Sequence, residues 1–272
     1  AVDCSNGSAS VTAPKIFMSL CDECFFIASH PNGTNINEKC GSTHLEILQD
    51  FVVRNKCAVG LAFDGDADRF LAVDENGDVV DGDKLIAIFA KYMKENGTLK
   101  NNTAVVTVMS NMGFFKFCED NNINCEKTKV GDRYVLENMV EKDFVIGGEQ
   151  SGHIIFKDFA TTGDGQLSAL KLLCIMKATG KKLSELASVM QVFPQTLINV
   201  RVSDFGKARF PNDEEIKNAI KEAEKELGDD GRVLVRVSGT EPLVRVMIEG
   251  KNEEKINTLA QEIAQVIKER LL

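Results

Sequence analysis

Three aspartates occupy alternate positions in the segment Asp64-Gly65-Asp66-Ala67-Asp68, and Arg69 follows them directly. Carboxylates this close repel one another, so a fold that keeps them together needs a compensating cation. Hard divalent ions such as Mg²⁺ prefer oxygen ligands of this kind. An arginine beside the ion suits a phosphate that guanidinium and cation would share. We therefore predict a Mg²⁺ site on Asp64, Asp66 and Asp68.

The residues before this segment support a functional site. Residues 58–63 are apolar except for one glycine and indicate a buried strand, so the carboxylates follow its C-terminal end. Ligands bind at that end of the strands in open α/β sheets. The alternative is an acidic surface turn, because Asp and Gly are common in turns.

Two other acidic motifs fit less well. A calcium loop of the EF-hand type places its glycine elsewhere than Gly65 and lies between helices, whereas strand-like segments flank this loop. A phosphatase of the haloacid dehalogenase type would follow its nucleophilic aspartate with Gly-Thr, which is absent here.

A second polar loop follows another predicted strand. Residues 147–153 read Gly-Gly-Glu-Gln-Ser-Gly-His. The glycines allow close approach of the backbone to a ligand. Glu149, Ser151 and His153 offer an acceptor, a hydroxyl and an imidazole to a polyhydroxylated ligand. A glycine-rich turn with a surface glutamate is the alternative.

A third loop carries groups suited to an anion. Ser238, Gly239 and Thr240 can present backbone N–H groups and two hydroxyls, and Arg236 and Arg245 flank them. This pattern indicates a phosphate-binding loop, although no Gly-Lys-Ser follows as in a Walker motif. A hairpin turn with surface arginines is the alternative.

A basic segment, residues 127–133, lies between the aspartate loop and the glycine-rich loop in the sequence. Lys129 and Arg133 surround a predicted strand-to-helix turn, where they could hold a second anion or transfer a proton. Taken by themselves, the two residues fit a solvated basic face better than a binding site.

Composition limits the classes of partner. Apolar residues make up 43% of the chain and charged residues 27%, which is typical of globular proteins. The net charge of −9 argues against nucleic acid as a partner. No apolar run is long enough to span a membrane, and no signal peptide is visible. The chain starts at Ala1 inside a strand-like segment, so we expect a fragment of a longer protein.

The eight cysteines do not form a convincing metal or disulfide pattern. Cys21 and Cys24 have metal-like spacing, but no second pair lies at a useful distance. Cys118, Cys125 and Cys174 lie within apolar patterns and suit a protein core. A reducing, cytoplasmic compartment is therefore expected.

Strand-like runs alternate with amphipathic segments, which favours an α/β fold. We predict two consecutive α/β domains with mixed sheets, a metal-binding domain over residues 1–97 and a sugar-binding domain over 98–195. A small α+β domain of the order β-α-β-β-α, which binds phosphate, is predicted over 196–272. Strands are expected over 24–28, 58–63, 70–73, 79–80, 103–109, 124–128, 143–147, 197–202, 232–237 and 243–249. Helices are expected from the turn 4–9 to Leu20 and over 45–54, 84–94, 113–121, 132–140, 165–178, 213–227 (with Asn212 as N-cap) and 253–271.

The loops, taken together in this order, form a far more specific sequence pattern than any single loop. The chain resembles the α-D-phosphohexomutases over essentially its whole length. The matching segments are 64–69 as the metal loop, 148–153 as the sugar loop and 236–242 as the phosphate loop. Residues 35–37, 40–44 and 129–134 resemble the bacterial glucosamine branch in particular. Val237 departs from the family, which commonly has proline there.

The resemblance implies a missing part. The family has four domains, and this chain looks like the second, third and fourth. The first carries the phosphoserine that donates and reclaims the phosphoryl group. Residues 28–31, Ala-Ser-His-Pro, imitate the serine loop but lie in the second-domain section, so we do not assign Ser29 as the nucleophile. The fragment alone is therefore expected to be inactive.

The resemblance also implies roles. The intact enzyme would interconvert glucosamine 6-phosphate and glucosamine 1-phosphate with Mg²⁺, and Arg69 and Lys129 would be its catalytic groups in this chain. The substrate-binding residues would be Arg133, Glu149, Ser151, His153, Arg236, Ser238, Gly239, Thr240 and Arg245. A mannose- or glucose-phosphate mutase and a non-catalytic sugar-phosphate binding module remain alternatives. The sequence does not indicate an oligomeric state.

Overall fold

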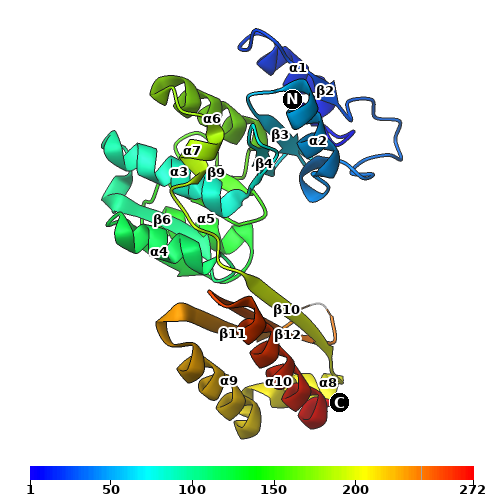
Figure 1. Cartoon of the computed structure of the whole chain (residues 1–272), viewed down its shortest axis with the longest axis vertical. Helices are drawn as coiled ribbons and strands as arrows, with labels where there is room; N and C mark the ends of the chain where they lie inside the picture. Colours follow the sequence, from blue (N-terminus) through cyan, green and yellow to red (C-terminus); the bar gives the residue numbers. More distant parts are fainter. Residues whose placement is uncertain (240) are drawn as a thin grey trace. The chain divides into compact units, whose positions relative to one another are not determined.

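The chain forms two compact units (Figure 1). The computed structural model describes residues 1–239 and 241–272. The first unit comprises Ala1–Ser110 and Phe114–Gln191, and the second comprises Asn111–Gly113 and Val192–Leu272.

The first sheet of the first unit is mixed and has the strand order β2-β1-β3-β4-β5. Strand β1 pairs in parallel with β2 and β3, whereas β4 and β5 continue the sheet antiparallel. Its strands are β1 (Val2–Asp3), β2 (Phe26–Ile27), β3 (Gly60–Phe63), β4 (Phe70–Val73) and β5 (Val79–Val80). Its helices are α1 (Ala9–Phe17) and α2 (Glu46–Asn55), with a 3-10 turn at Gly41–Thr43. All four residues of β3 are buried, as expected of a central strand.

The second sheet of this unit has the order β7-β6-β8-β9, parallel except for β9. Its strands are β6 (Thr103–Thr107), β7 (Asn124–Thr128), β8 (Ile146–Gly148) and β9 (Ile154–Phe156). The helices are α3 (Gly82–Glu95), α4 (Met112–Asp120), α5 (Asp132–Glu141), α6 (Gly165–Thr179) and α7 (Leu183–Ala187), with a 3-10 turn at Lys100–Asn102. One apolar cluster contains Phe63 and Phe70 from the first sheet, Phe156 from the second sheet and Phe114 from α4, so the two sheets share a core.

The second unit is a three-stranded antiparallel sheet of order β10-β12-β11 with helices packed against it. Its elements are β10 (Gln195–Arg201), α8 (Asp204–Arg209), α9 (Glu214–Leu227), β11 (Gly231–Val237), β12 (Leu243–Gly250) and α10 (Glu253–Leu271), with 3-10 turns at Phe210–Asn212 and Gly228–Asp230. Helix α9 packs on β11, and α10 on β10 and β12. Each strand pair is in continuous register over seven residues.

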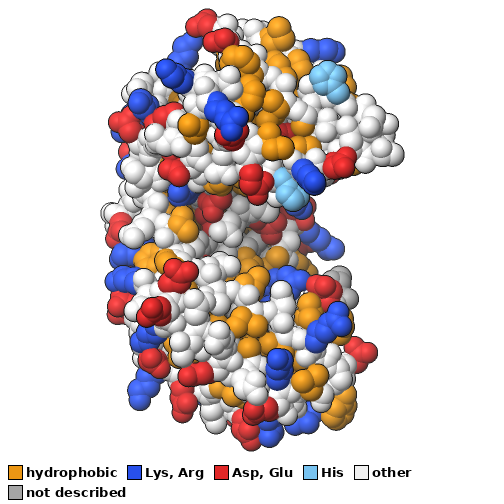
Figure 2. All heavy atoms as spheres, turned by 45° about the vertical axis from the view of Figure 1, so that its right-hand side comes forward, with side chains coloured by type: hydrophobic (Ala, Val, Ile, Leu, Met, Phe, Trp, Pro, Cys, Tyr) orange, Lys and Arg blue, Asp and Glu red, His pale blue; other side chains and the backbone are white. Residues whose placement is uncertain are grey.

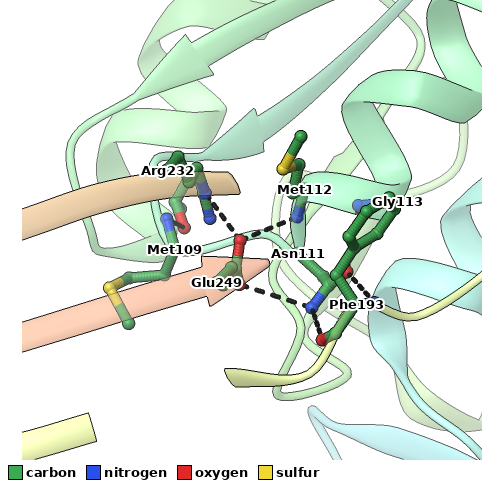
Figure 3. Close-up of polar contacts among 8 residues, drawn as sticks. Met109, Asn111, Met112, Gly113, Phe193, Arg232 and Glu249 are labelled. Carbon is green, nitrogen blue, oxygen red and sulfur yellow. Dashed lines mark hydrogen bonds and ion pairs between the residues drawn. The ribbon is translucent and has the colours of Figure 1, made fainter. Parts of the chain in front are cut away.

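A buried carboxylate organises one end of the second unit (Figure 3). Glu249 of β12 is fully buried, and its Oε2 accepts hydrogen bonds from Arg232 Nε at 2.6 Å and Met112 N at 2.9 Å. Its Oε1 accepts from Asn111 Nδ2 at 3.3 Å. The Asn111 side chain also pairs with both backbone groups of Phe193, at 3.0 and 2.9 Å. This network attaches the short segment Asn111–Gly113 to the sheet.

The predicted fold class is confirmed, with two mixed α/β sheets followed by a small α+β unit. Several details differ from the sequence prediction, and some strand and helix bounds are shifted by two or three residues. The N-cap of α9 is Asp213, whose carboxylate accepts from Ile216 N, rather than Asn212. Strand β2 is only two residues long. The elements β9, α7 and α8 were not predicted.

Candidate functional site

The aspartate loop joins β3 to β4 at the carboxyl end of β3. One oxygen from each of Asp64, Asp66 and Asp68 can be chosen so that the three lie within 4.8 Å of one another. Asp64 is only 8% exposed, whereas Asp66 faces solvent. Ala67 adopts a left-handed conformation with φ of 63°, which curls the loop between the carboxylates. The fold therefore gathers three oxygen ligands in one tight turn.

Burial is the main electrostatic feature of this loop. Burial, together with the charges of Asp68 and Asp66, raises the pKa of Asp64 to about 6, while the hydrogen bond from Arg69 N opposes the rise. That N–H donates to Asp64 Oδ1 at 3.1 Å, and Arg69 Nε lies 3.8 Å from Asp64 Oδ2. A buried carboxylate with like-charged neighbours is costly to ionise unless a cation binds there.

The carboxylates fit a divalent ion. Asp68 Oδ1 is buried and has no hydrogen-bond partner within residues 1–239 and 241–272. Such an oxygen is costly to leave unpaired. A hard cation on the three aspartates would satisfy it and offset their mutual repulsion. Asp64, Asp66 and Asp68 are therefore suited to hold Mg²⁺.

Protons are expected to compete with the cation. Because the pKa of Asp64 is raised to about 6, its carboxylate becomes protonated as the pH falls below that value and its ligating oxygen is lost. We expect the affinity of the chain for Mn²⁺, a probe for Mg²⁺, to be constant above pH ~7 and to fall about tenfold per pH unit below ~6. Paramagnetic titration from pH 5 to 8 measures this. An affinity that stays constant to pH 5 would contradict a ligand with this raised pKa.

The glycine-rich loop between β8 and β9 is held by backbone contacts. Glu149 N donates to the carbonyl of His153, and Gly152 N donates to the carbonyl of Glu149, both at 3.0 Å. Gly152 has φ of 92°, and a Cβ there would lie 2.3 Å from the carbonyl oxygen of Phe70. Only glycine fits this position. Ser151 is exposed at the tip of the loop.

The structure brings the glycine-rich loop and the aspartate loop together. Phe70 N donates to the carbonyl of Gly152 at 3.0 Å, and Arg69 and His153 form an antiparallel bridge. His153 Nδ1 lies 3.1 Å from Asp68 Oδ2. Hydrogen bonds and a β-bridge therefore join two segments that are far apart in sequence.

The basic segment lies beside the same loop. Glu149 Oε1 accepts from Gly131 N at 3.0 Å, which connects the turn between Lys129 and Arg133 to the glycine-rich loop. Both basic side chains are exposed, and Arg133 pairs with Glu137 at 2.7 Å. Lys129 therefore remains accessible to a ligand held by Glu149.

The anion loop belongs to the second unit, between β11 and β12. Arg236 and Arg245 face each other directly in the strand register. Burial lowers the pKa of Arg236, and the charge of Arg245 lowers it further. Like charges in such a pair are destabilising. Glu241 Oε2 lies 2.8 Å from Arg245 Nη2 and offsets the charge of that arginine. The two arginines and Glu241 together keep a net positive charge that an anion could neutralise.

Ser238 and Gly239 shape the turn of the same loop. Ser238 is 3% exposed, and its Oγ accepts from Glu241 N at 3.3 Å. A Cβ at Gly239 would meet nothing within 4 Å, so the backbone there is open to approach. Thr240, predicted to bind the anion, lies outside the described residues.

Sequence reasoning missed two structural glycines beside the aspartate loop. Gly165 N donates to the carbonyl of Ala67 at 3.0 Å, and Gly163 N donates to His153 Nε2 at 3.0 Å. The Gly-Asp-Gly spacing of residues 163–165 just before a helix was the available signal. Because the contacts of these glycines with Ala67 and His153 are not visible in the sequence, the spacing alone indicates only the start of a helix.

The surface carries mixed charge. On the face in Figure 2, Lys and Arg side chains lie among acidic and uncharged ones rather than in one continuous basic stripe. Within residues 1–239 and 241–272, no helix combines the length and apolar character needed to cross a membrane.

Three family models match the chain in sequence. Domain II of the phosphoglucomutase/phosphomannomutase family, an alpha/beta/alpha domain, matches residues 1–77. Domain III, also alpha/beta/alpha, matches residues 81–193. The C-terminal domain of the same family matches residues 197–266.

Curated relatives agree with these matches. A protein named phosphoglucosamine mutase from Acetivibrio thermocellus is 56% identical over 271 residues, which is 100% of this chain and 60% of the relative. One of the same name from Halalkalibacterium halodurans is 55% identical, again with 100% and 60% covered. The chain thus spans about 60% of the length of the curated relatives it matches.

Solved structures share the fold. The N-acetylphosphoglucosamine mutase of Aspergillus fumigatus superposes with a TM-score of 0.83 at 20% identity, covering 99% of this chain and 60% of that one. A phosphoglucomutase/phosphomannomutase family protein from Burkholderia thailandensis superposes with a TM-score of 0.81 at 24% identity, covering 100% and 61%. Sequence and fold agree that the chain belongs to the phosphoglucomutase/phosphomannomutase family, of which it carries domains II and III and the C-terminal domain.

Proposed function

We propose that the chain is the metal-, sugar- and phosphate-binding part of a phosphoglucosamine mutase. The reaction would interconvert glucosamine 6-phosphate and glucosamine 1-phosphate through a phosphoserine and a bisphosphorylated sugar. The observation that carries the proposal is that hydrogen bonds join the aspartate loop to the glycine-rich loop, which contains Glu149 and is called the Glu149 loop below. In the described part of the chain, Asp68 Oδ1 has no hydrogen-bond partner and could bind a cation. Relatives at 56% and 55% identity that bear this name support it.

The roles of the residues follow from charge and position. Mg²⁺ on Asp64, Asp66 and Asp68 would neutralise charge on the transferring phosphoryl group. Arg69, beside these carboxylates, would stabilise developing charge on the same group. Lys129, exposed next to the Glu149 loop, would exchange a proton with the sugar hydroxyl.

The substrate would be held at two ends. Glu149 and Ser151 would bind the sugar hydroxyls, with Arg133 and His153 nearby. The second set would hold the phosphate that does not react, and it comprises Arg236, Ser238, Gly239, Thr240 and Arg245. Holding the remote phosphate orients the reacting end without contacting it, and orientation is a large part of phosphoryl-transfer catalysis.

The nucleophile would come from an N-terminal segment outside this chain, which would be its main protein partner. We propose that the chain alone is inactive. Mixed with glucosamine 6-phosphate, Mg²⁺ and a trace of the bisphosphate, it should give no turnover above a blank. Turnover that Ser29→Ala abolishes would contradict this and make Ser29 the phosphate carrier. A cytoplasmic location is proposed as well, because all eight cysteines are free thiols.

A mutase for mannose or glucose phosphates is the second candidate, because the Glu149 loop suits any of these sugars. Rates of the intact protein on the three sugar 6-phosphates separate them, and the proposal expects glucosamine 6-phosphate to be fastest. A binding module without catalysis is the third candidate. It would be supported if the gene encoded no serine-bearing domain before Ala1.

Neutralising one arginine of the facing pair is expected to weaken anion binding. Arg236→Met should reduce the affinity of the chain for glucosamine 6-phosphate about 10- to 100-fold, because a charge-assisted hydrogen bond to a phosphate is lost. Its melting temperature without ligand should not fall, because the repulsion between Arg236 and Arg245 disappears. Calorimetric titration and thermal unfolding measure the two effects. The matched control is Arg201→Met, an exposed arginine on β10 of the same sheet. Equal losses in both variants would contradict a specific anion site.

A further inference from the structure

The Glu149 loop lies against the start of helix α3 as well as against the aspartate loop. Gly82, the first residue of α3, donates its backbone N–H to the carbonyl of Gln150 at 3.0 Å. A Cβ at Gly82 would lie 2.2 Å from the carbonyl oxygen of Glu149 and 2.7 Å from that of Gln150. Only a residue without a side chain allows the loop to approach the helix this closely.

A side-chain hydrogen bond adds to this backbone contact. Gln150 Nε2 donates to Asp81 Oδ2 at 3.2 Å, although the two residues are 69 positions apart. Asp81 is the N-cap of α3, and its other oxygen, Oδ1, accepts from Lys84 N at 3.0 Å. One carboxylate therefore caps the helix and holds the loop at the same time.

The charge of Asp81 determines which group suits position 150. An ionised carboxylate can only accept hydrogen bonds, so the nitrogen of the Gln150 amide must face it. The N-terminus of a helix favours the ionised form, because the positive end of the helix dipole lies there. A donor to an ionised acceptor makes a stronger hydrogen bond than a neutral pair does. A glutamate at position 150 would instead place two like charges together.

Gln150 lies between the two residues proposed to bind the sugar hydroxyls. Glu149 precedes it, and Ser151 follows it at the exposed tip of the loop. On the far side of the tip, the carbonyl of Gly152 accepts from Phe70 N at 3.0 Å. The loop is thus attached to β4 at Gly152 and to α3 at Gln150. Because neighbouring residues share a backbone, a displacement of Gln150 would move both adjacent side chains.

We propose that Gln150 is a positioning residue, which holds the Glu149 loop against the N-cap of α3 and so places Glu149 and Ser151 for the sugar hydroxyls. Its side chain contacts Asp81 rather than the substrate. The inference rests on the proposed sugar-binding role of Glu149 and Ser151. Correct placement of such groups is a large part of catalysis, so even a small displacement of the loop is costly.

Reversing the polarity of the pair tests the proposal. Gln150→Glu should lower the affinity of the chain for glucosamine 6-phosphate about tenfold, because two carboxylates then repel each other and displace the loop. Asp81→Asn alone should stay within about threefold of the unaltered chain, because the Gln150 amide can turn over and asparagine still caps α3. In the double variant the asparagine amide can donate to the glutamate, so the affinity should return to within about threefold. Calorimetric titration measures all four affinities.

The metal site separates positioning from a general loss of structure. The affinity for Mn²⁺, measured by paramagnetic titration, should not change in any of the variants, because the bond between Gly152 and Phe70 remains. Equal losses of Mn²⁺ and sugar-phosphate affinity in Gln150→Glu would overturn the proposal. A double variant that binds the sugar phosphate no better than Gln150→Glu would overturn it too, as would Gln150→Glu with undiminished affinity.

Hydrogen exchange gives a readout that does not depend on a ligand. The Gly82 amide donates to the carbonyl of Gln150, so it should exchange faster in Gln150→Glu and regain protection in the double variant. Unchanged exchange of Gly82 in Gln150→Glu would show that the side chain does not hold the loop. If Gly82 responds as expected but the unaltered chain binds no glucosamine 6-phosphate, the proposed function fails. The role of Gln150 toward a sugar then fails with it, whereas its contact with α3 stands.

Discussion

Asp64→Asn is expected to lower the affinity for Mn²⁺ or Mg²⁺ on the order of 100-fold and, at the same time, to stabilise the metal-free chain. The affinity falls because an anionic ligand is replaced by a neutral amide. The stability rises because burial and the charges of Asp68 and Asp66 have raised the pKa of Asp64 to about 6. The native state therefore resists ionising this group, and asparagine removes that cost while its Oδ1 can still accept from Arg69 N.

The sign of this stability effect depends on pH. Between the ordinary pKa of 3.8 and the raised value of about 6, the native state binds the proton more tightly than the unfolded chain, so stability falls as the pH rises through this window. The gain from Asp64→Asn should be about 1–3 kcal/mol at pH 7.5 and should shrink below pH ~5. Metal titration and urea unfolding at the two pH values measure both effects.

A control separates the site from charge in general. Asp22→Asn removes an exposed carboxylate of the same unit and should change neither quantity. An Asp64→Asn variant that binds the cation as well as the unaltered chain would show that Asp64 is not a ligand. One that is less stable without metal would show that the carboxylate has a structural role instead.

Glu249→Ala is expected to destabilise the second unit by about 3–5 kcal/mol. The carboxylate is fully buried and accepts hydrogen bonds from Arg232, Met112 and Asn111. Truncation removes an acceptor of the Arg232 guanidinium and of the backbone N–H of Met112. Glu249→Gln keeps an acceptor of the same shape and should cost less, because burial raises the pKa of Glu249 and makes its charge itself expensive.

The two units can be followed separately in this experiment. Both tyrosines of the chain, Tyr92 and Tyr134, lie in the first unit, so tyrosine fluorescence reports that unit alone. Hydrogen exchange of residues 231–250 reports the second. Glu249→Ala should accelerate that exchange. The control variant Glu222→Ala, which changes an exposed residue of α9, should leave it unchanged. Normal protection of 231–250 in Glu249→Ala would contradict the account of this network.

The elements and the aspartate loop could be predicted because their signals are local. Strand β7 and helix α10 have the bounds that alternation and helical spacing indicated. The three aspartates fall within one turn, so their proximity followed from their spacing. The unpredicted α7 and α8 are short, and α8 contains Gly206, so neither shows a helical period. Strand β9 has three residues, too few for alternation.

The contacts that shape the site were not predictable in the same way. His153 and Asp68 are 85 residues apart, and their contact arises only when two sheets share a core. The sequence showed the imidazole next to a serine and a glutamate, which suggested a shared ligand. The facing of Arg236 and Arg245 likewise depends on the register of β11 and β12, which the length of the turn alone does not determine.

We propose that Asp64, Asp66 and Asp68 serve a Mg²⁺-dependent transfer between the two phosphate positions of a hexosamine. The most direct measurement is phosphorus NMR of glucosamine 6-phosphate with the whole polypeptide that the gene encodes, Mg²⁺ and a trace of the bisphosphate. The account predicts that the 1-phosphate signal appears and that chelation of the metal or Asp64→Asn suppresses it. A 1-phosphate signal that persists in Asp64→Asn, or free phosphate as the product, would contradict it.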